Sequence, residues 1–310
     1  MIPLFTADHV RAAVPPARAV EAVREAFVAY ARGEWTMPPK VYVPAYPAGD
    51  FRAMPALGGG YALLKWVTSF PGNPQRGLPT VSGLVLVSSA EDGKLVALLD
   101  AGTVTALRTG AAAVLAAETL GRADAETAAV VGVGVNGEAA ALAFAAHGRT
   151  PLLWDLDRER AVAVAERVGG RVASREEALG ADVLVTVTPG REVLLPEGSL
   201  RPGQHVSLMG ADGPGKAEIA VEELARVRVF VDDWEQASHG GECAAAVAAG
   251  VLGRDDVTQL GDVLAGTAAG RTTNDEVTAF DSTGLALQDL AVALAALEQL
   301  DRLDLPVVSL

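Results

Sequence analysis

The chain has 310 residues, of which 39 are acidic and 25 are basic, so its formal net charge is −14. This charge disfavours nucleic acids and anionic membranes as partners, because their phosphates would repel the chain and no cluster of Lys and Arg offsets the repulsion. Hydrophobic residues make up 50% of the chain, which provides a sizeable core and excludes wholesale disorder. The length predicts two domains.

The cysteine and histidine content bears on the cellular compartment of the protein and on whether it binds a metal. Cys243 is the only cysteine, so no disulfide can form within the chain. The four histidines are scattered without the spacing of a metal site, and we expect no metal. The N-terminal segment lacks a secretory signal, and polar residues interrupt every apolar run before it reaches membrane-spanning length. These features predict a cytoplasmic protein.

The first third of the chain predicts a helix, several strands and a second helix. Apolar residues recur at helical spacing in 17–31, which indicates the first helix. Short β-like runs separated by Pro, Gly and Asn follow at 40–43, 61–66, 80–87 and 95–99. This pattern favours an antiparallel or mixed sheet with hairpins. The Ala- and Leu-rich stretch 103–120 predicts the second helix.

In the middle third, short apolar runs alternate with helical stretches, which predicts a parallel sheet covered on both faces. We expect strands at 128–131, 151–154, 183–187, 205–208 and 227–231, and helices at 138–146 and 158–168. Near the end, the stretch 283–300 is apolar around much of its circumference. It predicts a packed helix that returns to the first domain.

A glycine-rich turn joins a predicted strand to a predicted helix. Gly132, Gly134 and Gly137 form the motif GVGVNG directly after the run 128–131. In this context, GxGxxG is the fingerprint of a dinucleotide-binding Rossmann domain. Gly132 would permit the tight turn, Gly134 the approach of a pyrophosphate, and Gly137 close packing of helix and strand. The N–H groups at the start of the helix would hold the anion.

An acidic residue follows the next predicted strand. Asp155 stands where an acid hydrogen-bonds the hydroxyls of the adenosine ribose. It would repel a 2′-phosphate, so NAD is predicted over NADP, although the nearby Arg158 weakens this preference. The further candidates for cofactor binding are Val135, Asn136 and Thr188.

Several charged residues outside this motif suit a pocket for a reacting carbon. Lys65 interrupts the apolar run 61–67, and Arg108 lies among small residues. Each would need a partner if buried, or could face solvent. Asp212 follows the predicted strand 205–208, at the strand end where open α/β sheets bind ligands. An Asp between Gly and Pro residues is also typical of a turn.

Ordered blocks of sequence resemble the ornithine cyclodeaminase/mu-crystallin family over nearly the whole chain. The blocks include KWV at 65–67, PGNP at 71–74, LRT at 107–109, GVGVNG at 132–137, GADGPGK at 210–216 and DSTG at 281–284. Within this family, the segments 37–42, 52–56 and 232–242 resemble the archaeal-type NAD-dependent alanine dehydrogenases.

The resemblance implies an α/β fold with a doubly wound Rossmann sheet and an N-terminal α+β domain completed by the C-terminal helix. Residues 1–120, with 285–310 returning to them, would form a substrate-binding and dimerisation domain of a homodimer. Residues 121–284 would bind NAD. The implied activity is the reversible NAD-dependent oxidative deamination of L-alanine to pyruvate and ammonia.

The resemblance also implies roles for individual residues. By position, the catalytic pair would be Lys65 and Asp212. The anchors of the substrate carboxylate would be Lys40, Arg52 and Arg108. Further cofactor contacts would come from Arg108, Thr109, Ser282 and Gly284.

Arg52 stands where ornithine cyclodeaminases carry an acid that recognises the distal amine of the substrate. A guanidinium would repel an ammonium group, which disfavours ornithine and lysine as substrates. Arg52 could instead bind a second carboxylate, so a reductase of a ketimine or of an iminosuccinate-type acid is an alternative. An ornithine cyclodeaminase and a non-enzymatic, mu-crystallin-like binding protein are further alternatives. The presence of both Lys65 and Asp212 argues against the last of these.

Overall fold

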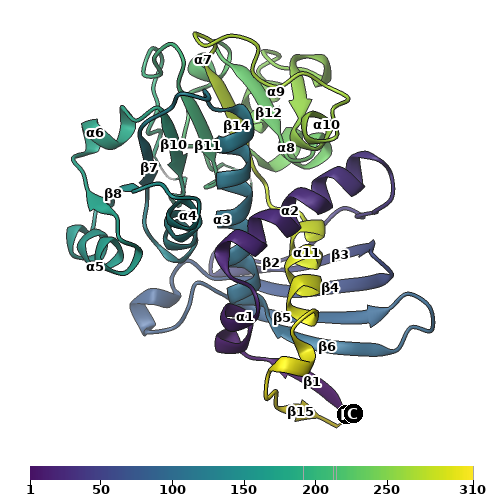
Figure 1. Cartoon of the computed structure of the whole chain (residues 1–310). Helices are drawn as coiled ribbons and strands as arrows, with labels where there is room; N and C mark the ends of the chain where they lie inside the picture. Colours follow the sequence, from purple (N-terminus) through teal and green to yellow (C-terminus); the bar gives the residue numbers. More distant parts are fainter. Residues whose placement is uncertain (191, 212, 214, 310) are drawn as a thin grey trace. The chain divides into compact units, whose positions relative to one another are not determined.

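The computed structural model describes residues 1–190, 192–211, 213 and 215–309. The chain forms two compact units, Met1–Arg108 with Leu285–Leu310 and Thr109–Gly284, whose elements are labelled in Figure 1. The division falls inside helix α3 (Ala101–Leu120), whereas the sequence analysis placed it after residue 120. Because α3 is one unbroken helix, no loop marks the division in the sequence.

The first unit contains a seven-stranded mixed sheet in the order β15-β1-β6-β5-β4-β3-β2. Its strands are β1 (Ile2–Phe5), β2 (Val41–Ala45), β3 (Gly49–Gly58), β4 (Tyr61–Ser69), β5 (Val81–Ser89), β6 (Leu95–Asp100) and β15 (Val307–Val308). β1 and β6 pair in parallel, and every other neighbouring pair in this order is antiparallel. The expected hairpin-rich sheet is therefore present.

Helices cover one face of this sheet. They are α1 (Ala7–Ala13), α2 (Pro16–Ala31) and α11 (Ala286–Leu297). α11 packs on α2 and on strands β3, β4 and β5, so the last long helix completes the first unit, as the sequence predicts. It begins at Ala286 rather than at 283, because Gly284 has a φ of 75° and Leu285 is extended.

The second unit contains an eight-stranded sheet in the order β13-β12-β14-β11-β10-β7-β8-β9, and all of its pairs are parallel. Its strands are β7 (Ala128–Val131), β8 (Leu152–Trp154), β9 (Arg171–Val172), β10 (Val183–Thr186), β11 (His205–Leu208), β12 (Arg228–Val231), β13 (Val257–Gln259) and β14 (Thr278–Asp281). The chain moves outward from β7 to β9 and then returns to the other side of β7 with β10. This reversal is the point at which doubly wound sheets bind ligands, and it confirms the predicted Rossmann fold.

Helices join the parallel strands of the second unit. They are α4 (Val135–Ala146), α5 (Arg158–Val168), α6 (Arg175–Leu179), α7 (Val221–Leu224), α8 (Trp234–Gly240), α9 (Cys243–Ala248) and α10 (Leu260–Leu264). Short 3₁₀ turns lie at Asn73–Arg76, Arg254–Asp256 and Leu300–Arg302. No helix among the described residues is both long and apolar enough to cross a membrane.

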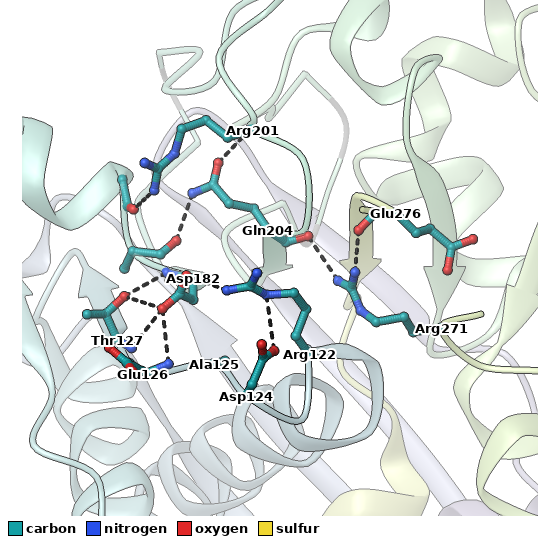
Figure 2. A network of polar contacts seen from close by, with 12 residues as sticks. Arg122, Asp124, Ala125, Glu126, Thr127, Asp182, Arg201, Gln204, Arg271 and Glu276 are labelled. Atoms are coloured by element: carbon teal, nitrogen blue, oxygen red, sulfur yellow. Dashed lines mark hydrogen bonds and ion pairs between the residues drawn. The ribbon is translucent and has the colours of Figure 1, made fainter. Parts of the chain in front are cut away.

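A polar network ties together the amino ends of the central parallel strands (Figure 2). Asp182, just before β10, accepts hydrogen bonds from the N–H groups of Glu126 and Thr127, which precede β7, and pairs with Arg122. Arg271 donates to the carbonyl oxygens of Leu120 and Gln204, at 2.7 and 3.1 Å. These contacts satisfy backbone groups at the edge of the sheet opposite the glycine-rich turn.

Candidate active site

The glycine-rich turn follows β7 at the switch point of the parallel sheet. Gly132 has a φ of 87°, and a Cβ atom on it would lie 2.6 Å from the carbonyl oxygen of Val187. A Cβ atom on Gly137 would collide with the carbonyl oxygen of Gly132. Above Gly134 the space is open, and α4 begins at the next residue without a side-chain cap. These features fit a pyrophosphate at the start of α4.

Asp155 lies beside this turn. Its Oδ2 accepts the N–H of Val133 at 2.8 Å, and its Oδ1 accepts the N–H of Asp157 at 2.8 Å. Arg160 approaches Oδ1 at 3.4 Å. The predicted neighbour Arg158 lines a cavity of about 360 Å³ together with Trp154, Asp155, Leu156, Ala161, Val172, Ala173 and Ser174. A carboxylate at the rim of such a cavity fits the adenosine end of a dinucleotide.

Thr188, the candidate after β10, is held by a buried acid that the sequence analysis missed. Glu218 accepts hydrogen bonds from both the N–H and the Oγ1 of Thr188, each at 2.7 Å. It also accepts from Thr186 Oγ1 at 2.7 Å and from the N–H of Gly210 at 2.9 Å. Burial raises the pKa of Glu218. This side chain therefore joins the ends of β10 and β11, next to the glycine turn.

Ser282 and Gly284 lie in a loop fixed by a second buried acid, Asp232. Its Oδ2 accepts the N–H groups of Thr283 and Gly284 at 2.7 and 2.9 Å, and the hydroxyl of Ser282 at 3.2 Å. The N–H and hydroxyl groups of this loop therefore bind Asp232, which fixes the backbone of the loop. Asp232 is 2% exposed, and nothing in the sequence analysis singled it out as a functional residue.

In the first unit, Lys65 on β4 is 1% exposed, like the apolar residues Leu63 and Val67 on the same face of its strand. The interpretation of Lys65 as a solvent-facing residue is therefore wrong. Its Nζ lies 2.7 Å from Oδ2 of Asp289 on α11 and 3.3 Å from Oγ1 of Thr105 on α3. The alternation of the strand directs the ammonium group inward, where it requires a partner.

Two further cations surround this ammonium group. Nε of Arg108 lies 3.4 Å from Oδ1 of Asp289, and Lys40 precedes β2. Burial lowers the pKa of Lys65 to about 7, opposed by Asp289 and reinforced by the charges of Arg108 and Lys40. A lysine with this pKa near neutrality can donate and accept a proton.

Arg52 has a partner within the protein. Its Nε lies 2.6 Å from Oδ1 of Asp50, its Nη2 lies 3.3 Å from Oδ2, and its guanidinium stacks 5.2 Å from the ring centre of Tyr42. The positive charge that the sequence analysis assigned to a substrate carboxylate is thus partly neutralised by Asp50. Asp50 and Arg52 alternate onto one face of β3, which is a signal that the sequence analysis did not use.

The other predicted cofactor contacts lie on helices. Thr109 is buried on α3 directly after Arg108, while Val135 and Asn136 form the first residues of α4. Asp212 lies outside the described residues. Among the residues that the structure does describe, no group of three or more His, Cys, Asp or Glu side chains could hold a metal ion.

Asp289 is the main residue that sequence reasoning missed. The apolar pattern of 283–300 predicts only a packing helix, although an acid within so apolar a stretch signals a buried charge partner. Asp289 is 0% exposed and contacts both Lys65 and Arg108. The signal in the sequence was therefore an acid within one apolar stretch and bases within or beside others, which could form a pair in the core.

Comparison with known proteins agrees with this geometry. The family model for the ornithine cyclodeaminase/mu-crystallin family matches residues 4–302. The chain belongs to this family. The family relative alanine dehydrogenase of Archaeoglobus fulgidus is 42% identical over 309 residues, which cover 95% of this chain and 94% of the relative.

Two solved members of the family share the fold. An archaeal alanine dehydrogenase dimer with bound NAD superposes with a TM-score of 0.93 at 41% identity, covering 99% of each chain. The iminosuccinate reductase of Paracoccus denitrificans in complex with NAD⁺ superposes with a TM-score of 0.90 at 27% identity, covering 100% of this chain and 99% of the reductase. The family resemblance seen in the sequence, including its archaeal-type alanine dehydrogenase branch, is therefore confirmed.

Proposed function

We propose that the protein catalyses the reversible NAD-dependent oxidative deamination of L-alanine to pyruvate and ammonia. The observation that carries this proposal is the buried Lys65, with Arg108 and Lys40 as neighbouring charges, in a chain 42% identical to an alanine dehydrogenase. A cationic group of this kind suits a small acid that has a carboxylate next to the reacting carbon.

The predictions of an oxidoreductase and of NAD are confirmed by relatives that are dehydrogenases or reductases solved with NAD or NAD⁺. In this chain, the open space above Gly134 and the carboxylate of Asp155 beside Val133 fit that cofactor. When bound, the nicotinamide accepts or returns a hydride.

Arg108 is the best placed anchor for the substrate carboxylate. It is 11% exposed, and its contacts with Asp289 and Gln288 are long, at 3.4 and 3.5 Å. The five N–H donors of a guanidinium leave capacity for a carboxylate. Arg52 is a weaker candidate, because Asp50 already occupies its Nε and Nη2.

Lys65 would move the protons. In oxidation, the Cα–H bond of alanine breaks, its electron pair leaves as hydride, and the amine loses a proton to give an imine. Water then adds to the imine carbon, the C–N bond breaks, and ammonia leaves with pyruvate as the second product. A neutral Lys65 accepts a proton in this direction, and a protonated Lys65 returns it in reductive amination. Asp212 is proposed as the relay during hydration of the imine.

The test is to follow NADH with pyruvate and ammonium, and in the reverse direction with L-alanine and NAD⁺. We expect turnover in both directions, with pyruvate preferred among small 2-oxo acids. NADH oxidation that occurs only with another substrate would reassign the substrate, and no turnover with any 2-oxo or imino acid would favour a binding protein.

Reduction of an iminosuccinate-type acid is the second candidate function, supported by the likeness to iminosuccinate reductase and by the several cations of the first unit. Oxaloacetate with ammonium provides this substrate, and a rate exceeding that with pyruvate would favour it. Ornithine cyclodeamination would consume ornithine without net formation of NADH. Because Asp50 pairs with Arg52, repulsion of a distal ammonium group is weaker than the sequence alone indicates.

We further propose a homodimer formed through the outer face of the first sheet. Exposed apolar side chains gather on this face of β2, β3 and β4, opposite the face that carries Lys65: Val41, Val43, Leu57, Leu64 and Trp66. On β2, β3, β4 and β5 the registered residues of this face carry no charge, so a second copy could pack here despite the net charge of −14. Leu64→Glu should dissociate the dimer in sedimentation analysis, whereas Val162→Glu on α5 should not.

A further inference from the structure

Lys65 takes its charge partner from a helix more than two hundred residues further along the chain. We propose that Asp289 is a positioning residue that holds the ammonium group of Lys65 and orients Arg108 beside it. This inference rests on the proposed function for its meaning in catalysis, but the contact itself can be tested without a substrate.

The geometry of Asp289 supports a role beyond packing. Its two carboxylate oxygens face different cations, with Oδ2 2.7 Å from Lys65 Nζ and Oδ1 3.4 Å from Arg108 Nε. The side chain is 0% exposed on a helix that otherwise carries mostly Ala, Leu and Val. A buried ion pair is often no more stabilising than well-packed apolar residues of similar volume. Stability alone therefore gives little reason for an acid here.

The start of α11 is arranged to support this contact. Gln288 Oε1 accepts the N–H of Leu285 at 3.2 Å and lies 3.5 Å from Nη1 of Arg108. Gln288 is itself fully buried. Adjacent residues of one helix thus contact two cations on two other elements, Lys65 on β4 and Arg108 on α3. Asp289 is placed to set the separation of these cations.

The charges around Lys65 determine what the loss of Asp289 would do. Asp289 raises the pKa of Lys65, whereas burial, Arg108 and Lys40 lower it. On β3, Asp50 and Arg52 pair with each other, and on α2 the partly exposed Arg18 pairs with glutamates. The carboxylate of Asp289 is therefore the anion that keeps Lys65 protonated near neutral pH.

The direct test is titration of Lys65 by NMR in Asp289→Asn. The chain has four lysines, Lys40, Lys65, Lys94 and Lys216, so ¹⁵N-labelled lysine Nζ signals can be assigned by substitution. We expect the midpoint of Lys65 to fall by about one pH unit or more, as for removal of an opposite charge within ~4–6 Å. The matched control is Glu298→Gln, which removes a carboxylate that pairs with Arg18 at the far end of α11.

Activity provides the second readout. In reductive amination the rate should fall as Lys65 loses its proton, and in Asp289→Asn this limb of the pH profile should move to lower pH by the same amount. A purely structural role would lower the rate without moving the limb. An unchanged Lys65 midpoint in a folded Asp289→Asn protein would overturn the proposal. A shifted midpoint in a protein that turns over no 2-oxo acid would leave the proposal standing and reject the proposed function.

If Asp289→Asn does not fold, the pairing can be tested by stability. Lys65→Met alone leaves Asp289 short of one cation, and adding Asp289→Leu removes the buried acid as well. We expect the double variant to be at least as resistant to urea as Lys65→Met, because coupled residues are not additive. A further large loss of stability in the double variant would contradict the pairing.

Discussion

A lysine normally extends its charge to solvent, but Lys65 is 1% exposed. Such burial requires several compensating contacts, which the structure provides through Asp289 and Thr105. Because these contacts compete with desolvation and with Arg108, the pKa of Lys65 lies at about 7. A group with this pKa is present in both protonation states at physiological pH, as a reversible reaction requires.

Replacement of Lys65 by Met should abolish most activity while retaining the volume of the side chain. We expect kcat/KM for pyruvate to fall by about 10²–10⁴-fold, the usual contribution of a positioned acid or base. NADH oxidation with pyruvate and ammonium measures this loss. Lys94→Met, at an exposed site, serves as the control, and equal rates in both variants would exclude Lys65 from catalysis.

Asp155 should control the choice between NADH and NADPH. Its carboxylate is fixed by the N–H groups of Val133 and Asp157, so a 2′-phosphate next to it would meet a rigid negative charge. We expect Asp155→Ser to raise the ratio of kcat/KM for NADPH over NADH by about tenfold or more. It should also weaken NADH binding, because the turn loses an acceptor.

The matched control for Asp155 is Asp157→Ser. Asp157 caps α5 through the N–H of Arg160, and Ser preserves the cap. The substitution of Asp157 removes a negative charge near the cofactor site without disturbing the glycine turn. A cofactor preference that changes equally in both variants would indicate a general charge effect rather than recognition by Asp155.

At the scale of whole elements, polar side chains fix both ends of the parallel strands, and those at the carboxyl ends are buried. Glu218 and Asp232 bind backbone groups at the carboxyl ends, and the network of Figure 2 binds those at the amino ends. The carboxyl ends carry the glycine turn and the loop of Ser282. Rigid strand ends hold these loops in place, which is the usual condition for a precise site.

Arg271 donates to the carbonyl oxygens of Leu120, Gln204 and Glu276 and to Thr278 Oγ1. We expect Arg271→Ala to lower the free energy of unfolding by about 2–4 kcal/mol, because buried acceptors lose their donor. Urea denaturation measures this.

Arg167→Ala is the control for Arg271, since it removes a two-contact ion pair with Glu138 in which Arg167 is 55% exposed. Exposed pairs of this type contribute about 0–1 kcal/mol. If both substitutions have equally small effects, the amino-end network does not stabilise the sheet.

Most of the elements could be predicted from the sequence because local periodicity determines them. β3 escaped prediction because Pro55 and the terminal glycines of Gly49–Gly58 interrupt its β pattern. β14 begins with a Thr and ends in a buried acid, Asp281. Its strand character depends on central position in the sheet, which no local pattern reports.

The same distinction separates the predicted from the missed site residues. The glycine turn and Lys65 stand out locally, by spacing or by a charge within an apolar run. Asp289 and Glu218 matter through residues distant in sequence, Lys65 and Thr188. Such pairings become visible only when the fold brings the partners together.

At the scale of the whole molecule, buried acids and exposed acids have opposite tendencies. Hydration keeps exposed carboxylates ionised, but Glu242 and Asp281 lie in the interior of the second unit. Burial raises the pKa of Glu242 to about 9 and that of Asp281 to about 7, with neighbouring acids adding to both shifts. At neutral pH, Glu242 is therefore protonated and can remain in the core.

This shift predicts how stability depends on pH. The folded state binds a proton at Glu242 that the unfolded state releases above a pKa of 4.5. The contribution of this proton to stability is therefore complete below that value and is lost as the pH rises towards about 9. Lys65 contributes in the opposite direction, because its pKa is lowered from 10.5 to about 7 in the folded state. Its contribution to stability therefore increases as the pH rises between these two values.

Comparison with Glu242→Gln isolates this contribution, because both proteins contain Lys65. Between slightly acidic pH and about pH 9, wild type should lose more stability than Glu242→Gln in urea denaturation. Glu222→Gln, at an exposed position, should follow wild type. Parallel pH curves for wild type and Glu242→Gln would contradict the assignment.

The first unit is built from two segments that are far apart in the sequence. This arrangement determines which unit can fold first during synthesis. The second unit, Thr109–Gly284, is one continuous segment, whereas the first unit needs both Met1–Arg108 and Leu285–Leu310. On the ribosome, the second unit can fold before α11 emerges, because domains fold as their segments become available. Until then Lys65 has no access to Asp289, and the inner face of β3 and β4 lacks its covering helix. Assembly of the lysine site is therefore among the last events in the production of the molecule.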